Sequence, residues 1–84
     1  MTEHTIKCWK QYFEDVQDGI KTFDVRKKDR DYKLGDTLVL EEFRGHMGEY
    51  TGRRLTKRVV YYAEHDDSPL GSGIAEGYCI MGLE

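Results

Sequence analysis

Hydrophobic positions along the first twenty residues change from a two-residue spacing to a helical one. In residues 4–9 polar and apolar side chains alternate up to Cys8, which is typical of a strand with one buried face. From Lys10 the apolar positions recur every three or four residues, and Gly19 stands where a left-handed residue would end a helix. The pattern therefore predicts a first strand at 4–9 and a short helix over 10–18. The apolar positions assigned to the helix face are Trp9, Phe13, Val16 and Ile20.

Four further strands follow from the remaining pattern. The first of them alternates strictly, with Phe23 and Val25 on one side and Thr22, Asp24 and Arg26 on the other. We expect its apolar side to face the core, and the more continuous apolar run of the next strand to be buried on both sides. The four strands are expected at residues 22–26, 37–43, 55–62 and 77–82. The expected core includes Phe23, Val25, Leu38, Leu40 and Ile80.

Five short strands and one early helix predict an α+β fold that is mostly β. A flat sheet of this size would leave its edges exposed, and curling it into a small barrel removes most of that exposure. We therefore expect a five- to six-stranded β-barrel with one short N-terminal helix covering one side. The chain of 84 residues is expected to form a single domain over 1–84, with one long loop at 66–73 around Pro69.

The composition excludes two classes of protein. Hydrophobic residues make up 38% of the chain and aromatic residues 12%, which is too much for a disordered chain, while 35% charged residues are too many for a membrane protein. The longest apolar run, at 59–63, is far shorter than the ~18 residues of a membrane-spanning helix. The N-terminus lacks the basic and apolar segments of a signal peptide. We therefore expect a cytoplasmic protein with no membrane association.

The cysteines and histidines do not form a pattern that binds a metal. Cys8 and Cys79 lie in apolar strand patterns, so in a reducing cytosol we expect buried, free thiols rather than a disulfide. The histidines have no short metal-ligand spacing, and the sequence therefore predicts neither a metal site nor a bound cofactor. They are His4, His46 and His65.

The charge is unevenly distributed around a net value of −3. Residues 21–33 contain six basic and three acidic side chains, residues 53–58 contain four basic and no acidic ones, and the rest of the chain is strongly acidic. The two stretches would form one electropositive face if folding brings them together. Each stretch is also compatible with a plain solvated surface, and the charge pattern leaves both interpretations open.

The junction between the predicted helix and the following strand gathers charges of both signs. Asp24 and Arg26 are two residues apart, so they share a face of the strand, and Lys21 stands where the chain enters it. Lys21 and Arg26 can hold a phosphate, and Asp24 can accept from a base edge or act on a reacting group. An ordinary surface ion pair, which contributes ~0–1 kcal/mol, is the alternative.

The spacing Gly-x-Lys-x-x-Asp-x-Arg, formed by Gly19, Lys21, Asp24 and Arg26, resembles the Gly-x-Lys-x-x-Glu-x-Arg motif of ASCH domains in the PUA-like superfamily. The chain looks like a small, uncharacterised bacterial and phage subfamily of these domains, and the resemblance covers residues 5–83. Asp24 replaces the usual glutamate and shortens its reach by one methylene. The resemblance implies a PUA-like β-barrel whose cleft is lined by the motif, and PUA-like relatives commonly bind RNA.

The resemblance also implies a catalytic alternative. One ASCH-like branch hydrolyses acetylated cytidine with the motif lysine, a threonine at the position of Asp24 and a distant glutamate. Lys21 matches that lysine, Asp24 does not match the threonine, and Glu64 and Glu76 are the candidates for the glutamate. A lysine acts as a base only if its pKa falls well below the ordinary ~10.4, which a nearby carboxylate opposes. Binding is therefore favoured over catalysis, with an amidohydrolase as the alternative.

Further candidates for the site are a helix tyrosine and the cations of the second basic stretch. Tyr12 adjoins Phe13, which belongs to the buried face, so Tyr12 is expected to point toward the cleft. Basic side chains beside Tyr61 and Tyr62 fit a platform for single-stranded nucleic acid, although strand tyrosines also pack in cores. We expect a monomer that binds RNA or a nucleotide-like small ligand. The expected site comprises Lys21, Asp24, Arg26, Tyr12, Arg53, Arg54 and Arg58.

Overall fold

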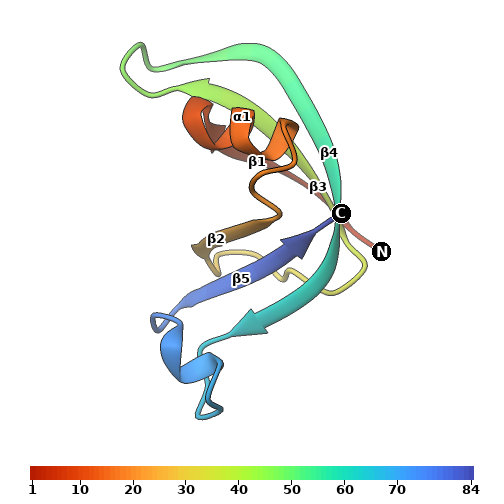
Figure 1. Ribbon diagram of the computed structural model, residues 1–84, viewed down its shortest axis with the longest axis vertical. Helices are drawn as coiled ribbons and strands as arrows, with labels where there is room; N and C mark the ends of the chain where they lie inside the picture. Colours follow the sequence, from red (N-terminus) through yellow and green to blue (C-terminus); the bar gives the residue numbers. More distant parts are fainter.

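The change of hydrophobic spacing near the N-terminus produces the first two elements of the computed structural model, which describes residues 1–84 (Figure 1). Strand β1 spans Glu3–Trp9, and helix α1 spans Lys10–Gln17. The helix ends as predicted, because Gly19 adopts the left-handed conformation with a φ of +75°. Phe13 and Val16 are buried on the face that the spacing predicts.

Four more strands complete the fold and match the predicted number and order. The loop predicted at 66–73 connects the last two of them, and β4 begins earlier than the predicted residue 55. No helix of the structure has both the length and the hydropathy needed to cross a membrane. The elements are β2 (Phe23–Lys27), β3 (Thr37–Arg44), β4 (Glu49–Glu64), the short 3-10 helix η1 (Gly71–Gly73) and β5 (Tyr78–Leu83).

One sheet contains all five strands in the order β1-β3-β4-β5-β2. β1 runs parallel to β3, and the other neighbouring strands are antiparallel. The 16-residue strand β4 pairs with β3 through its first part and with β5 through its last part. The sheet therefore curves along β4, with β1 and α1 at one end and β2 and β5 at the other (Figure 1).

The closed barrel predicted from the sequence is not formed, and this prediction is wrong. β1 and β2 are the two ends of the strand order and share no backbone ladder. Because a helix rather than a tight turn connects them, nothing local forces the two strands into register. A side chain crosses the seam between them instead, since Arg26 Nη2 donates to the backbone oxygen of Lys7 at 3.0 Å. The fold is mostly β, with one short helix and an open, curved sheet.

The hydrophobic core lies inside the curve of the sheet and under α1. Leu38 and Leu40 are fully buried as predicted, whereas Ile80 is only partly buried. Its neighbours Cys79 and Met81 take the inward positions of β5 and are completely covered. The core cluster consists of Ile6, Cys8, Phe13, Val16, Tyr32, Leu38, Leu40, Val59, Cys79, Met81 and Leu83.

The prediction of which face of β2 is buried is also wrong. Phe23 and Val25 are 43% and 53% exposed, whereas Asp24 is only 6% exposed. Asp24 lies opposite Met81 of β5, which is fully buried, so the polar side of the strand faces inward. The burial of Asp24 is stabilised by its hydrogen bond from the guanidinium of Arg26, because a charge that is removed from water needs a charged partner.

The two ends of the predicted helix face are more exposed than expected. Ile20 is 76% exposed and Trp9 is 49% exposed. Trp9 packs edge-on against Phe43 with ring centres 5.6 Å apart, and a Cβ at Gly45 would lie 1.7 Å from the indole ring. Trp9 therefore anchors the start of α1 to the turn after β3 and does not fill the core.

Both cysteines are free and buried, and burial raises the pKa of each thiol. We therefore expect iodoacetamide to modify the folded protein at pH 8 about tenfold more slowly than the urea-unfolded protein. Unfolding without reductant should then allow two alkyl groups per chain, which mass spectrometry counts. An unfolded chain that takes up no alkyl group and is two hydrogens lighter would show a bridge between Cys8 and Cys79 and contradict this prediction.

Candidate functional site

The motif residues at the start of β2 form one ionic cluster. The end of α1 positions Lys21, because its backbone N–H donates to the carbonyl oxygen of Asp15 at 3.0 Å. Lys21 Nζ donates to the backbone oxygen of Phe23 at 2.7 Å and lies 3.7 Å from Asp24 Oδ1. Arg26 Nε donates to Asp24 Oδ2 at 2.5 Å. Asp24 is therefore held between two cations, and this cluster lies on the inward side of the strand.

A pocket of about 560 Å³ opens beside this cluster, and we call it the motif pocket. It lies between the end of β1, the first turn of α1 and the residues around β2. Four residues predicted for the site from the sequence line it, namely Lys21, Asp24, Arg26 and Tyr12. The other lining residues are Lys7, Cys8, Trp9, Phe23 and Val25.

The lining of the motif pocket is positively charged and aromatic. Asp24 supplies its only carboxylate, against three cations. Lys21 Nζ lies 5.4 Å from the ring centre of Tyr12 and 4.9 Å from that of Phe23, so the ammonium group is placed between two aromatic side chains. Such a lining accepts phosphate or carbonyl groups together with flat rings. The three cations are Lys7, Lys21 and Arg26.

Sequence reasoning missed several contributors to this pocket. Lys7 of β1 points its Nζ toward the ring of Phe43, 4.2 Å from the centre, and takes part in no ion pair. Phe23 and Val25 also line the pocket, although their alternation in the sequence predicts that they face the core. The polar spacing of the first strand marks Lys7 as outward-facing, but only the curvature of the sheet brings this end strand close to Arg26 of β2.

The arginines that the sequence assigned to the site from the second basic stretch do not line the motif pocket. They lie on β4, and each one is bound by a carboxylate that is distant in sequence. Because these guanidinium groups are paired and lie outside the motif pocket, they add no free donors to its lining. The pairs are Arg53 with Glu42 at 2.6 Å, Arg54 with Glu41 at 3.2 Å and Arg58 with Glu84 at 2.9 Å.

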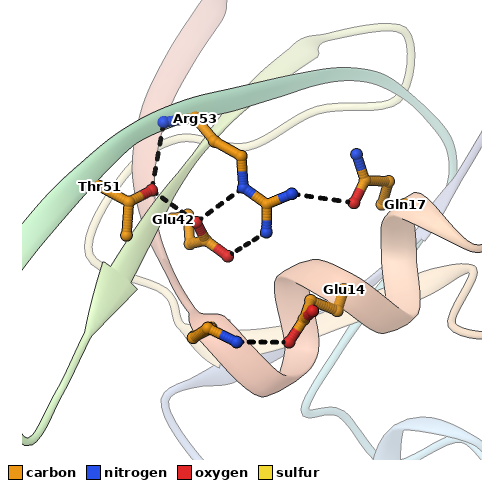
Figure 2. Close-up of polar contacts among 6 residues, drawn as sticks. Glu14, Gln17, Glu42, Thr51 and Arg53 are labelled. Carbon is orange, nitrogen blue, oxygen red and sulfur yellow. Dashed lines mark hydrogen bonds and ion pairs between the residues drawn. The ribbon is translucent and has the colours of Figure 1, made fainter.

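The pair of Arg53 with Glu42 is the most completely bonded of the three (Figure 2). Arg53 donates from Nε to Glu42 Oε1 at 2.9 Å and from Nη2 to Oε2 at 2.6 Å, and Thr51 Oγ1 donates to Oε1 at 2.5 Å. These donors hold the pKa of the buried Glu42 carboxyl at about 2. Arg53 also reaches Gln17 of α1 at 3.4 Å and lies 5.0 Å from the ring centre of Phe13. The network fastens β3 and β4 to the helix.

The two late glutamates considered for a catalytic role do not line the motif pocket. Glu64 accepts from Lys28 Nζ at 2.6 Å and lies at the end of β4. Glu76 is exposed in the turn before β5. Asp24 is therefore the only acidic side chain in contact with the pocket, and it is already engaged by Arg26.

Comparison with known proteins gives a match to a family model and a similar phage protein. A family model described as "Domain of unknown function (DUF3850)" matches residues 3–83. A protein of Escherichia phage P2, described as "Uncharacterized 12.9 kDa protein in GpA 3'region", is 39% identical over 64 residues. The matched segment is 76% of this chain and 57% of the phage protein, so the similarity spans little more than half of that relative. Neither description names a ligand or a reaction.

Proposed function

The chain belongs to the DUF3850 family, and we propose that it is a small binding module that holds RNA or a nucleotide-like ligand in the motif pocket. The observation that carries this proposal is the lining of the pocket, which combines three cations with aromatic rings around a single paired carboxylate. Cations bind phosphate or carbonyl oxygens, and aromatic rings stack on bases. Three of the lining residues, Lys21, Asp24 and Arg26, belong to the motif that resembles ASCH domains, and we propose kinship with that PUA-like group on this motif.

The individual side chains have separable roles in this proposal. Lys21 and Arg26 bind phosphate or carbonyl oxygens of the ligand, and Asp24 fixes the orientation of Arg26 through its bond to Nε. Tyr12 and Phe23 are 44% and 43% exposed, so each has a ring surface available for stacking. Stacking on an aromatic ring contributes ~1–3 kcal/mol per base and does not depend strongly on base identity.

Hydrolysis of a modified nucleoside such as acetylcytidine is supported less well. The amidohydrolase that the motif suggests uses a distant glutamate together with the lysine, and neither Glu64 nor Glu76 lines the pocket. Lys21 also lies 3.7 Å from the Asp24 carboxylate and donates to the backbone oxygen of Phe23, so its ammonium group is already engaged by two acceptors. These contacts favour binding.

Titration of labelled single-stranded RNA at low salt tests the proposal. We expect Lys21→Ala to weaken binding about fivefold or more, and to lower the slope of log K against log salt by about 0.7, because one phosphate contact is lost. Lys10→Ala is the matched control, since Lys10 is an exposed cation of α1 that bonds Glu14 and lies outside the motif pocket.

Two outcomes would overturn this proposal. Equal losses from Lys10→Ala and Lys21→Ala would reduce the binding to general charge attraction. Failure of the wild-type protein to bind any RNA or nucleotide at low salt, combined with release of acetate from acetylcytidine that Lys21→Ala abolishes, would assign the pocket to hydrolysis.

A further inference from the structure

A second, smaller pocket adjoins the motif pocket along the seam between β1 and β2. Its volume is about 260 Å³, and its lining is almost entirely polar. Lys7 and Arg26 line both pockets, so the two hollows meet where Arg26 Nη2 donates to the backbone oxygen of Lys7. We call this smaller hollow the seam pocket. Because β1 and β2 do not pair, it lies at the one place where the sheet is open.

Tyr32 contributes an unusual group to the seam pocket. Its side chain is 3% exposed and packs edge-on against His4 with ring centres 4.7 Å apart. Its hydroxyl is the one buried side-chain polar atom of the protein without a well-aligned hydrogen-bond partner, and the guanidinium of Arg26 lies close to it. Burial raises the pKa of Tyr32, so the hydroxyl keeps its proton and remains a donor. A buried donor without an acceptor is costly, and such groups in folded proteins commonly mark a place where a ligand or water binds.

The charges around this hydroxyl favour an anion. Arg26 and Arg30 line the seam pocket with Lys7, and neither Arg30 nor Lys7 takes part in an ion pair. The pocket also contains two carboxylates, of which Glu41 is already bound by Arg54 and Asp29 is free. The free cations therefore outnumber the free carboxylates. Guanidinium groups and a protonated hydroxyl are the donors that a phosphate group accepts from.

We propose that the seam pocket is the phosphate subsite of the same ligand whose base occupies the motif pocket, so that the protein recognises nucleotides rather than nucleosides. This inference rests on the proposed function. Arg30 and Arg26 bind the phosphate oxygens, and Tyr32 donates its hydroxyl to one of them. The shared wall of Lys7 and Arg26 places the phosphate next to the base, as in a nucleoside monophosphate or one unit of an RNA chain.

Calorimetric titration with each ribonucleoside and its 5′- and 3′-monophosphates tests the subsite. We expect the better monophosphate to bind about tenfold more tightly than its nucleoside, because charge-assisted bonds are added. Arg30→Gln and Tyr32→Phe should each reduce this advantage to less than about threefold while leaving nucleoside affinity unchanged. Tyr32→Phe should not lower the unfolding midpoint, since the hydroxyl has no well-aligned partner to lose. Lys27→Gln is the matched control, because Lys27 is an exposed cation of β2 that lines neither pocket.

The possible failures of this test are distinguishable. The phosphate subsite is wrong if monophosphates bind no more tightly than nucleosides, or if Arg30→Gln and Tyr32→Phe leave the higher affinity for monophosphates unchanged. RNA binding that depends on Lys21 would still support the proposed function in either case. A titration with inorganic phosphate, followed by the amide resonances of Arg30 and Tyr32, examines the subsite without any base. Shifts that Arg30→Gln removes would show that the seam pocket binds phosphate, as the subsite requires, and absence of shifts would count against the subsite.

Discussion

Replacing Arg53 with methionine is expected to lower the unfolding midpoint at pH 7 by roughly 10 °C. Methionine keeps much of the contact with the ring of Phe13 but removes three donors, two to Glu42 and one to Gln17. The Glu42 side chain is only 2% exposed, so its charge would stay buried with Thr51 as its sole side-chain donor. A buried charge that loses its partner is among the most destabilising single changes in a protein. Thermal denaturation followed by circular dichroism measures the shift.

The pH dependence of this effect identifies its cause. In the wild-type protein the pKa of Glu42 is about 2, below its ordinary 4.5, so the pair stabilises the fold fully above pH 4.5 and less as the pH falls toward 2. In Arg53→Met, burial without a counter-charge should raise the pKa of Glu42 above 4.5. Lowering the pH then protonates Glu42 and removes the buried charge from the variant, whereas in the wild-type protein it weakens the pair with Arg53. The difference in unfolding midpoint between the two proteins should therefore shrink from pH 7 to pH 3.

Arg54→Met is the matched control for this prediction. Arg54 is the next residue of β4, and it pairs with Glu41 at 3.2 Å, but its side chain is 57% exposed and that of Glu41 is 33% exposed. An exposed pair contributes little, so this control should change the midpoint by only a few degrees at any pH. Similar shifts for both variants, or a difference that does not change with pH, would show that the buried carboxylate is not the cause.

The same arginine shows why only part of the predicted set of residues gathers at the motif pocket. Lys21, Asp24 and Arg26 are close in sequence, so the end of a helix and the two-residue period of a strand were sufficient to predict that they gather. The partners of the second basic stretch come from β3 and the C-terminus, through strand register and long-range contacts. A local charge count cannot include partners that only tertiary structure supplies, and it therefore overstates the free positive charge of residues 53–58.

The inverted faces of β2 have a related explanation. Alternation separates Phe23 and Val25 from Asp24 and Arg26, but it does not state which set faces inward. Hydrophobicity alone assigns the apolar set to the core, and the structure reverses this because the ionic cluster is paired internally and lines a pocket. The predicted barrel failed for a topological reason, since closure requires β1 to pair with β2 and the seam is instead crossed by the side chain of Arg26. Both departures from the sequence prediction lie at the candidate site.

Asp24→Ala is expected to lower the free energy of unfolding by about 2 kcal/mol, and Asp24→Glu is expected to recover most of that loss. The side chains of Lys21 and Arg26 are 16% and 23% exposed, so removal of the carboxylate leaves two poorly hydrated cations facing each other. Glutamate is the usual residue at this position of the motif, and it restores the charge with one more methylene. Urea denaturation at pH 7 measures both changes.

Hydrogen exchange adds a local readout that distinguishes positioning of Arg26 from a general loss of stability. Asp24 holds Nε of Arg26, and the same guanidinium donates from Nη2 to the backbone oxygen of Lys7 across the seam. Asp24→Ala should therefore speed exchange in β1 and β2 more than in β3 and β4, because Arg26 no longer joins the two end strands. If Asp24→Ala is as stable as the wild-type protein, or if exchange rises evenly over the sheet, then Asp24 does not organise the pocket. Binding would in that case depend on the cations alone, and Asp24→Ala should bind RNA at least as tightly as the wild-type protein, because one repelling charge is gone.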